Sequence, residues 1–204
     1  MKIIEIKDLT LQRNGRQLFA GLNATIAKGS ISAIVGPNGC GKSSLLLAIT
    51  GDLKPSSGSV FIAEKNLQEL SDLEQSHLRS MALQERTFWL PMTVQEVLAL
   101  GQSDNSIKQI EKMAADLGLT ELFDNLVTTL SVGQVQRVEI ARTLLRDCPI
   151  YIFDEPFAAQ DLASKEKLIE IFKQMRSAGK TIILVAHSEV EKLSWCDQII
   201  QLGS

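Results

Sequence analysis

The feature that most constrains the fold is a short glycine-rich segment between an apolar run and a helical pattern. Ile31–Val35 is almost entirely apolar, which is typical of a strand buried on both faces of a parallel sheet. Residues 36–44 then fit the pattern G-x-x-x-x-G-K-[ST], and a helical pattern continues to Thr50. In such a loop, backbone N–H groups and the helix N-terminus form an anion site. The sequence therefore predicts an α/β protein that binds nucleotide phosphates here.

Two side chains of this loop have specific expected parts. Lys42 can reach the β- and γ-phosphates, and the Ser43 hydroxyl can hold Mg²⁺. The expected nucleotide-binding residues of the loop are Gly36, Asn38, Gly39, Cys40, Gly41, Lys42, Ser43 and Ser44. Alkylation of the Cys40 thiol is therefore expected to block nucleotide binding. The loop alone does not choose among kinases, GTPases, helicases and transport ATPases.

A second candidate group of residues is a pair of carboxylates that follows an apolar run. Residues 150–153 are all apolar and predict a buried strand, which ends at Asp154 and Glu155. Ligands of open α/β sheets bind at the carboxyl ends of the strands. Asp154 is therefore expected to organise the Mg²⁺ shell, and Glu155 to polarise an attacking water as a general base. A strand that ends in a solvated acidic turn is the alternative interpretation.

A third motif, residues 130–138, leads into a helical pattern over residues 135–145. Ser131 and Gln134 have the spacing of a capping box, in which each residue satisfies the other's backbone N–H. This structural interpretation is compatible with a functional one, because a capped helix N-terminus is also an anion site.

Strand and helix patterns alternate at both ends of the chain. A hairpin signal at Asn14-Gly15 lies in the N-terminal part, residues 72–126 have a helical period and few strand signals, and a later helix is expected to be capped by Ser164. Further short strands are predicted at residues 3–6, 9–11, 18–19, 58–62, 181–186 and 199–200. This order predicts a mostly parallel sheet, an antiparallel portion at the N-terminus and a helical insertion.

Composition sets the outer bounds. The chain has 204 residues and a formal net charge of −3, so it lacks the basic character of a protein that wraps nucleic acid. Its longest apolar stretches are a few residues, whereas a bilayer span needs about 20. The 3 cysteines are scattered and do not suggest a disulfide framework. We expect one cytosolic domain rather than a membrane channel or a disulfide-rich secreted module.

Taken in order along the chain, these motifs resemble those of the ATP-binding cassette (ABC) ATPases. The similar parts are the phosphate loop, Gln84, the signature-like segment 130–134, the Asp154-Glu155 pair and the late histidine His187. The resemblance implies a P-loop NTPase cassette with a RecA-like, mostly parallel core sheet, an N-terminal antiparallel β-subdomain and an inserted α-helical subdomain. Residues 1–204 would form one nucleotide-binding domain, with a core of about 1–71 and 147–204 and a helical subdomain of 72–146.

The resemblance also implies roles for single residues. Glu155 and His187 would be catalytic, with His187 on the γ-phosphate, and Gln84 would join Ser43 and Asp154 around Mg²⁺. Asp161 would lie at the interface of an ATP-bound, head-to-tail dimer of two copies. In that dimer the signature of one copy would contact the ATP of the other through Ser131, Val132, Gly133 and Gln134.

The chain departs from the family pattern at four positions. Val132 stands where the signature usually has glycine, which would be strained only if that backbone needed a positive φ. Gln160 replaces the usual leucine, and Ser188 replaces a common aspartate. Arg13 stands near the place of an aromatic residue that stacks on adenine. A guanidinium can also stack on a π face, so Arg13 is an ATP-binding candidate, with a solvated hairpin arginine as the alternative.

The resemblance implies an ATPase subunit that powers a separate integral membrane permease, with ATP and Mg²⁺ as cofactors. Residues 83–101 are similar to the corresponding segment of metal and metal-chelate importers, which would add an extracytoplasmic solute-binding protein that acts through the permease. Phe88 and Trp89 would dock on the permease or pack within the helical subdomain. The chain would lie in the cytoplasm at the inner face of the cell membrane and bind no nucleic acid. A small ABC exporter and a weakly hydrolysing or non-hydrolysing regulatory cassette are the alternatives.

Overall fold

The computed structural model describes residues 1–13, 15–82, 91–102, 107–186 and 190–203, and its centre is a five-stranded parallel sheet. The strand order is β6-β7-β8-β3-β9, and every pairing in it is parallel. The strands span Arg79–Ala82 (β6), Ile150–Asp154 (β7), Thr181–Val185 (β8), Ile31–Val35 (β3) and Gln198–Gln201 (β9). The mostly parallel core sheet predicted from the sequence is confirmed.

A second, antiparallel sheet is built from N-terminal residues in the order β2-β1-β4-β5. It contains β1 (Lys2–Arg13), β2 (Arg16–Ala27), β4 (Ser57–Ile62) and the short β5 (Lys65–Asn66). The separate short strands expected before residue 20 are parts of β1 and β2, which continue through irregular register. Asn14, at the expected turn, lies outside the described residues.

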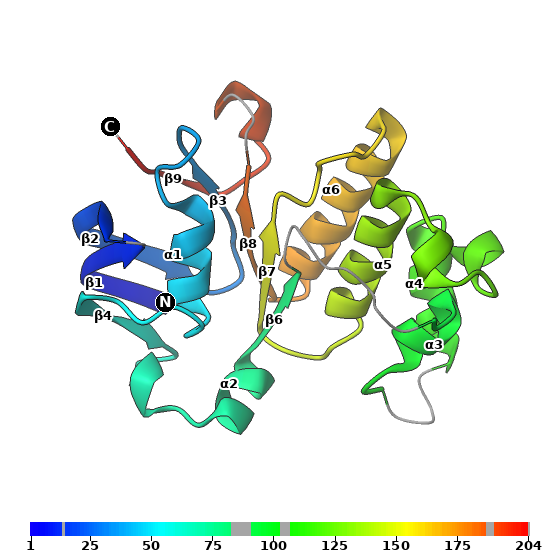
Figure 1. Cartoon of the computed structure of the whole chain (residues 1–204), viewed down its shortest axis with the longest axis horizontal. Helices are drawn as coiled ribbons and strands as arrows, with labels where there is room; N and C mark the ends of the chain where they lie inside the picture. Colours follow the sequence, from blue (N-terminus) through cyan, green and yellow to red (C-terminus); the bar gives the residue numbers. More distant parts are fainter. Residues whose placement is uncertain (14, 83–90, 103–106, 187–189, 204) are drawn as a thin grey trace.

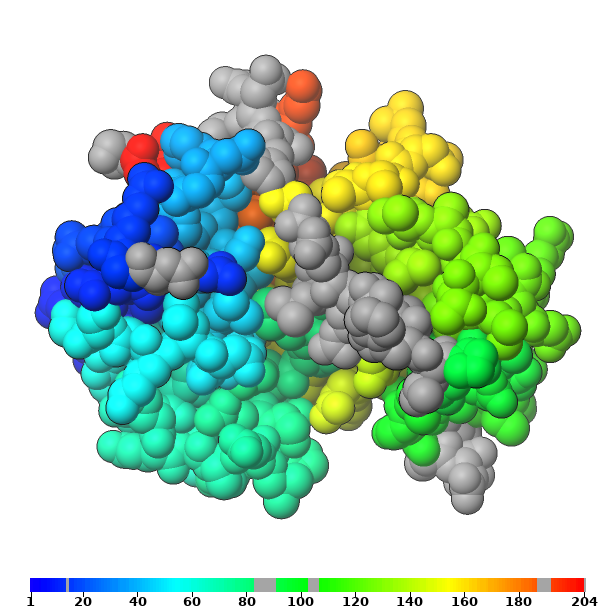
Figure 2. Space-filling model, viewed as in Figure 1, coloured from blue at the N-terminus to red at the C-terminus, as the bar shows by residue number. Residues whose placement is uncertain are grey.

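The helices lie in layers around the two sheets (Figure 1). Helix α1 (Lys42–Ile49) lies between the antiparallel and the parallel sheet, whereas α5 (Val132–Leu144) and α6 (Leu162–Ser177) cover the other face of the parallel sheet. The remaining elements are α2 (Asp72–Leu78), α3 (Val94–Ala99), α4 (Ile107–Asp116) and the 3₁₀ helices Leu67–Glu69, Thr120–Leu122, Val127–Thr129 and Val190–Leu193. In the space-filling view, the N-terminal residues and the residues of α3 and α4 form opposite ends of the visible face (Figure 2).

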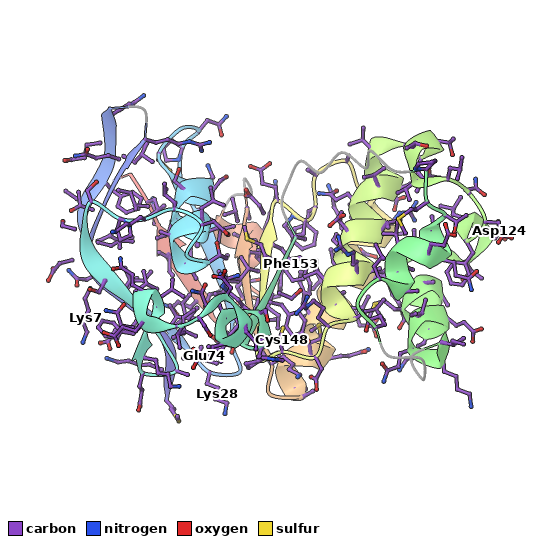
Figure 3. All side chains as sticks on the ribbon, turned by 60° about the horizontal axis from the view of Figure 1, so that its bottom comes forward. Lys7, Lys28, Glu74, Asp124, Cys148 and Phe153 are labelled. Atoms are coloured by element: carbon purple, nitrogen blue, oxygen red, sulfur yellow. The ribbon has the colours of Figure 1, made fainter. Side chains whose placement is uncertain are left out.

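The alternation of side chains along each parallel strand creates two cores. On β7, Ile150 and Ile152 pack with α1 and the antiparallel sheet, whereas Tyr151 and Phe153 pack with α5 and α6. Phe153 is fully buried, its ring centroid 4.9 Å from that of Phe172 on α6, and it lies near the middle of the molecule (Figure 3). A strand buried on both faces explains why residues 150–153 are all apolar.

Two local expectations are wrong. Strand β6 lies within the segment expected to be helical. Its four residues carry little β signal, and pairing with the buried strand β7 holds them in a strand. Helix α5 includes the expected helical pattern from residue 135 and begins at Val132, as the capping box at Ser131 implies. Helix α6 is capped by Asp161 rather than Ser164, whose backbone N–H donates to the Asp161 carboxylate. Among the described helices, none is long and apolar enough to cross a bilayer.

Candidate site for nucleotide binding and hydrolysis

The glycine-rich loop leaves the carboxyl end of β3 and leads directly into α1. Gly41 is the N-cap of α1 and has a φ of 105°, which a residue with a Cβ rarely adopts. A Cβ on Gly41 would also lie 3.1 Å from the Phe19 ring and 3.2 Å from the Leu18 Cβ. Strand β2 therefore packs closely on the loop, and only glycine fits at this position.

The Lys42 side chain is buried and folds over the loop that precedes it. Its Nζ donates to the carbonyl oxygens of Gly36 at 2.9 Å and Pro37 at 3.0 Å. An ammonium group carries three N–H donors, so these two bonds use two of them. The charge is thus held inside the loop, next to the backbone N–H groups at the start of α1.

A cleft of about 420 Å³ opens over this loop. Its walls come from the β1–β2 hairpin, the loop with the start of α1, and the end of β7. The described residues that line it are Arg13, Leu18, Asn38, Gly39, Gly41, Lys42, Ser43, Ser44 and Glu155. The fold thus brings predicted site residues from three separate parts of the chain to one cleft, including the exposed Arg13.

The two carboxylates lie where the buried strand predicts them. Asp154 is the last residue of β7 and is buried, whereas Glu155 is half-buried and lines the cleft. Glu155 has a φ of 53°, in the left-handed region, and its carbonyl oxygen accepts from the Ala158 backbone N–H at 3.1 Å. The Ser43 hydroxyl and the Asp154 carboxylate are both oxygen donors, the kind of ligand that Mg²⁺ prefers.

The signature-like segment forms the N-terminus of α5. The predicted capping box is confirmed, because the Ser131 hydroxyl accepts from the Gln134 N–H at 3.3 Å and the Gln134 side chain accepts from the Ser131 N–H at 2.8 Å. Val132 is the first helical residue, so its backbone needs no positive φ, and its side chain is 78% exposed. None of residues 131–134 is among the described residues that line the cleft.

The turn before α6 packs tightly against this helix start. Ala159 has a φ of 53°, and a Cβ on Gly133 would stand only 2.6 Å from the Ala159 carbonyl oxygen. Asp161 caps α6 by accepting from the Ser164 backbone N–H at 2.8 Å. This hydrogen bond, with the nearby Arg137 charge as a smaller cause, holds the pKa of Asp161 below its usual range.

Two glutamines join these segments, and the sequence had assigned no role to either side chain. The Gln160 Nε2 donates to the Gly133 carbonyl oxygen at 3.2 Å and to the Gln136 Oε1 at 2.9 Å. The Gln136 Nε2 in turn donates to the Glu155 carbonyl oxygen at 2.8 Å. In the sequence Gln160 differs from the family pattern, and nothing local to it signals its contact with Gln136.

Some candidate residues are not brought into the described cleft. Gln84, Phe88, Trp89, His187 and Ser188 lie outside the described residues. Cys40 is half-buried within the loop, where a Cβ on Gly36 would lie 2.8 Å from its Sγ and one on Gly203 would lie 3.2 Å from its Cβ. Leu18 lines the cleft although the sequence did not mark it as a site residue.

Comparison with protein families gives a match that covers most of the chain. The family model described as ABC transporter matches residues 19–158. This range includes the loop, the signature-like segment and the Asp154-Glu155 pair.

Individual relatives agree with that match. A hemin import ATP-binding protein of Nocardia farcinica is 31% identical over 98% of this chain and 74% of its own length. A zinc transport system ATP-binding protein of Treponema pallidum is 31% identical over 98% of this chain and 78% of its own length. Among solved structures, a nucleotide-free ATP-binding cassette from an ABC transporter is similar in fold, with a TM-score of 0.84 and 24% identity over 100% of this chain and 90% of that one.

Proposed function

The chain belongs to the ABC transporter family as an ATP-binding ATPase subunit, and on that premise we propose that it powers import of a metal ion or metal chelate through a separate membrane permease. The observation that carries the hydrolytic part is the single cleft that joins Lys42, Ser43 and Glu155. The metal-type substrate is supported by the relatives named for hemin import and zinc transport, and by the importer-like pattern of residues 83–101.

We propose that ATP lies across the cleft with its phosphates on the loop. The backbone N–H groups of the loop and the start of α1 would bind phosphate oxygens, and Lys42 would exchange its carbonyl partners for the β- and γ-phosphates. Arg13 lies at the cleft from the hairpin side, where its guanidinium can stack on adenine. Asn38, Gly39 and Ser44 complete the lining on the loop side.

The oxygen donors of Ser43 and Asp154 fit Mg²⁺, and we propose that they hold it together with Gln84. Bound there, the ion neutralises charge that develops on the phosphates. Glu155 is the proposed general base: its carboxylate takes a proton from the water that attacks the γ-phosphorus, while ADP departs as the leaving group. His187 is the proposed donor to the γ-phosphate, and Gln84 and His187 lie outside the described residues.

A second copy of the chain is the proposed partner that completes the site. The cleft in one copy has no lining from residues 131–134 among the described residues, yet those residues form an accessible, capped helix N-terminus. In a head-to-tail dimer, Ser131 and Gly133 of one copy would meet the γ-phosphate bound by the other. Two exposed apolar side chains, Val132 (78% exposed) and Leu162 (72% exposed), flank the contact between the helix start and the turn before α6.

The permease is the proposed membrane partner, and the chain would lie against it at the inner face of the cell membrane. A groove of about 460 Å³ between the core sheet and the helices offers a surface for it. Three arginines, Arg79, Arg142 and Arg146, and the exposed Leu100 line this groove. We propose a division into a core of 1–71 and 147–204 and a helical part of 72–146, with β6 assigned to the core sheet.

The decisive test of the hydrolytic site is Glu155→Gln. This change keeps the size of the side chain but removes the base, so turnover should fall below detection while ATP binding persists and ATP-dependent dimers accumulate. Steady-state ATPase assays and size-exclusion chromatography with and without ATP measure the two effects. Retention of normal turnover in Glu155→Gln would show that Glu155 is not the base. Wild-type protein with no ATPase activity even beside its permease would instead favour a non-hydrolysing cassette.

The transport proposal is tested in cells. A strain without this chain should lose uptake of labelled zinc or hemin, and the intact chain should restore it whereas Glu155→Gln should not. Unchanged uptake together with reduced efflux of a solute would contradict the importer proposal and favour the exporter alternative.

A further inference from the structure

Two glutamine side chains connect the start of α5 with the end of β7. Gln160 donates from one amide group to Gly133 and to Gln136, and Gln136 donates to the carbonyl oxygen of Glu155. We propose that Gln160 is a positioning residue for ATP hydrolysis, which acts through Gln136 on the backbone of Glu155. This inference rests on the proposed role of Glu155 as the base.

Glu155 needs such support because its backbone is in an unfavourable conformation. Its φ of 53° lies in the left-handed region, which residues with a Cβ avoid unless their surroundings impose it. The carbonyl oxygen of Glu155 accepts two hydrogen bonds, from the Ala158 N–H at 3.1 Å and from the Gln136 Nε2 at 2.8 Å. The peptide group thus fixed determines where the Glu155 carboxylate stands in the cleft.

Gln160 stabilises the orientation of the Gln136 amide. A side-chain amide has one acceptor oxygen and one donor NH₂ group, which are interchangeable in shape. The Glu155 carbonyl oxygen accepts from the Gln136 NH₂ group, and Gln160 favours the same orientation because it donates to the Gln136 oxygen at the other side of the amide. Leucine, the usual residue of the family at position 160, has no N–H with which to select this orientation.

The other N–H of Gln160 reaches the signature-like segment. It donates to the Gly133 carbonyl oxygen. The Ala159 carbonyl oxygen lies so close to Gly133 that a Cβ there would stand 2.6 Å from it, so glycine is needed at this position. A displacement of this helix start would therefore reach Glu155 through two side chains. Gln160 and Gln136 thus connect the signature-like segment to Glu155. In the proposed dimer, that segment would meet the ATP bound by the other copy, whereas Glu155 would act on the ATP bound by its own copy.

The test is a double-mutant cycle with Gln160→Leu and Gln136→Met on the full chain. Both changes keep approximate side-chain size and remove the amide. Each should lower kcat about threefold to tenfold, the range expected for one amide hydrogen bond, with KM for ATP unchanged within twofold. Because both residues act on one contact, the double variant should be no slower than the slower single variant.

Gln160→Glu gives a sharper prediction. An ionised carboxylate only accepts hydrogen bonds, so it would attract the Gln136 NH₂ group away from Glu155, and kcat should fall further than in Gln160→Leu. The matched control is Gln174→Leu, at an exposed glutamine on α6, the helix that follows Gln160; this variant should keep wild-type kcat. Thermal unfolding of every variant verifies that the chain is folded.

The outcomes separate this inference from the proposed function. Three outcomes would overturn the positioning role while Glu155→Gln remains inactive. They are full activity in Gln160→Leu and Gln136→Met, a double variant whose loss of kcat is the product of the two single losses, and changes confined to KM. An active Glu155→Gln would instead overturn the role of the base itself.

Discussion

Alkylation of the Cys40 thiol should block ATP binding, and the environments of the three cysteines make this selective. Cys40 is half-buried in the phosphate loop. Cys148 is buried, and desolvation raises the pKa of its thiol. Burial also raises the pKa of Cys196, to about 12. Because the thiolate is the nucleophile, the latter two react slowly near neutral pH.

The expected selectivity follows from the thiolate fractions. At about pH 7.5, a free cysteine with the ordinary pKa of about 8.5 is roughly one-tenth thiolate. With a pKa of about 12, Cys196 is thiolate in roughly 3 molecules per 100,000 at that pH. The raised pKa therefore leaves Cys196 on the order of 10³ times less ionised than a free cysteine in solution. N-ethylmaleimide at low excess should spare Cys148 and Cys196 and add one group, at Cys40.

The assay is intact-mass and peptide mass spectrometry during labelling, followed by nucleotide binding. ATP present at about 100 times its dissociation constant leaves about 1% of the loops free, so labelling of Cys40 should slow roughly 100-fold. The labelled chain should bind ATP too weakly to measure, because the adduct has no room on the side of Gly36 and Gly203 and must extend into the loop. Cys40→Ser, treated in the same way, should keep its ATP binding.

Three results would refute this reasoning. They are labelling of Cys196 before Cys40, a labelling rate for Cys40 that ATP does not change, and unchanged ATP affinity after Cys40 is modified. The first would contradict the argument from burial, and the other two would contradict the placement of ATP on this loop.

Two further substitutions test packing. Gly133→Ala places a Cβ 2.6 Å from the Ala159 carbonyl oxygen. Overpacking costs about 1–3 kcal/mol of unfolding free energy and the better helix propensity of alanine adds back about 1 kcal/mol, so urea unfolding should show a net loss of about 1 kcal/mol. The variant should also have a lower kcat, because the helix start moves away from Gln160. An unchanged kcat would contradict that displacement, and the exposed Val132→Ala is the control for the unfolding measurement alone. Phe153→Ala should cost about 3–5 kcal/mol of unfolding free energy, more than the partly exposed Phe61→Ala, since Phe153 is fully buried against Phe172. A loss below about 1 kcal/mol would show that the two cores are not packed as described.

The parts of the site that follow one another in the chain could be predicted from the sequence. The loop, its flanking strand and helix, and the capping box at Ser131 each depend on contacts within a few residues. The Asp154-Glu155 pair was predictable because an unbroken apolar run identifies a buried strand and therefore its end. Local chemistry determines these features, and a single sequence displays it directly.

Contacts between distant segments could not be predicted in the same way. Strand β6 exists because β7 lies beside it, and its own four residues do not indicate a strand. The bonds of Gln160 to Gly133 and Gln136 join positions 27 and 24 residues apart, and each glutamine alone is typical of a solvated surface. The approach of the β1–β2 hairpin to the loop, which places Leu18 on Gly41, depends likewise on the complete fold.

Two departures from the family pattern, Val132 and Gln160, lie at the same contact between the start of α5 and the turn before α6. Val132 causes no backbone strain because it begins a helix, and it presents an apolar side chain that is 78% exposed, where glycine would present none. Burial of a valine in the proposed dimer would add about 1.5–3 kcal/mol per copy to association. Gln160 lies in the turn that packs against this helix start, where its side chain donates to the Gly133 carbonyl oxygen and to the Gln136 Oε1. In the proposed dimer, a tighter contact at Val132 would act on a helix start that Gln160 connects to the proposed base. We therefore expect the two substitutions to strengthen the link between association and hydrolysis.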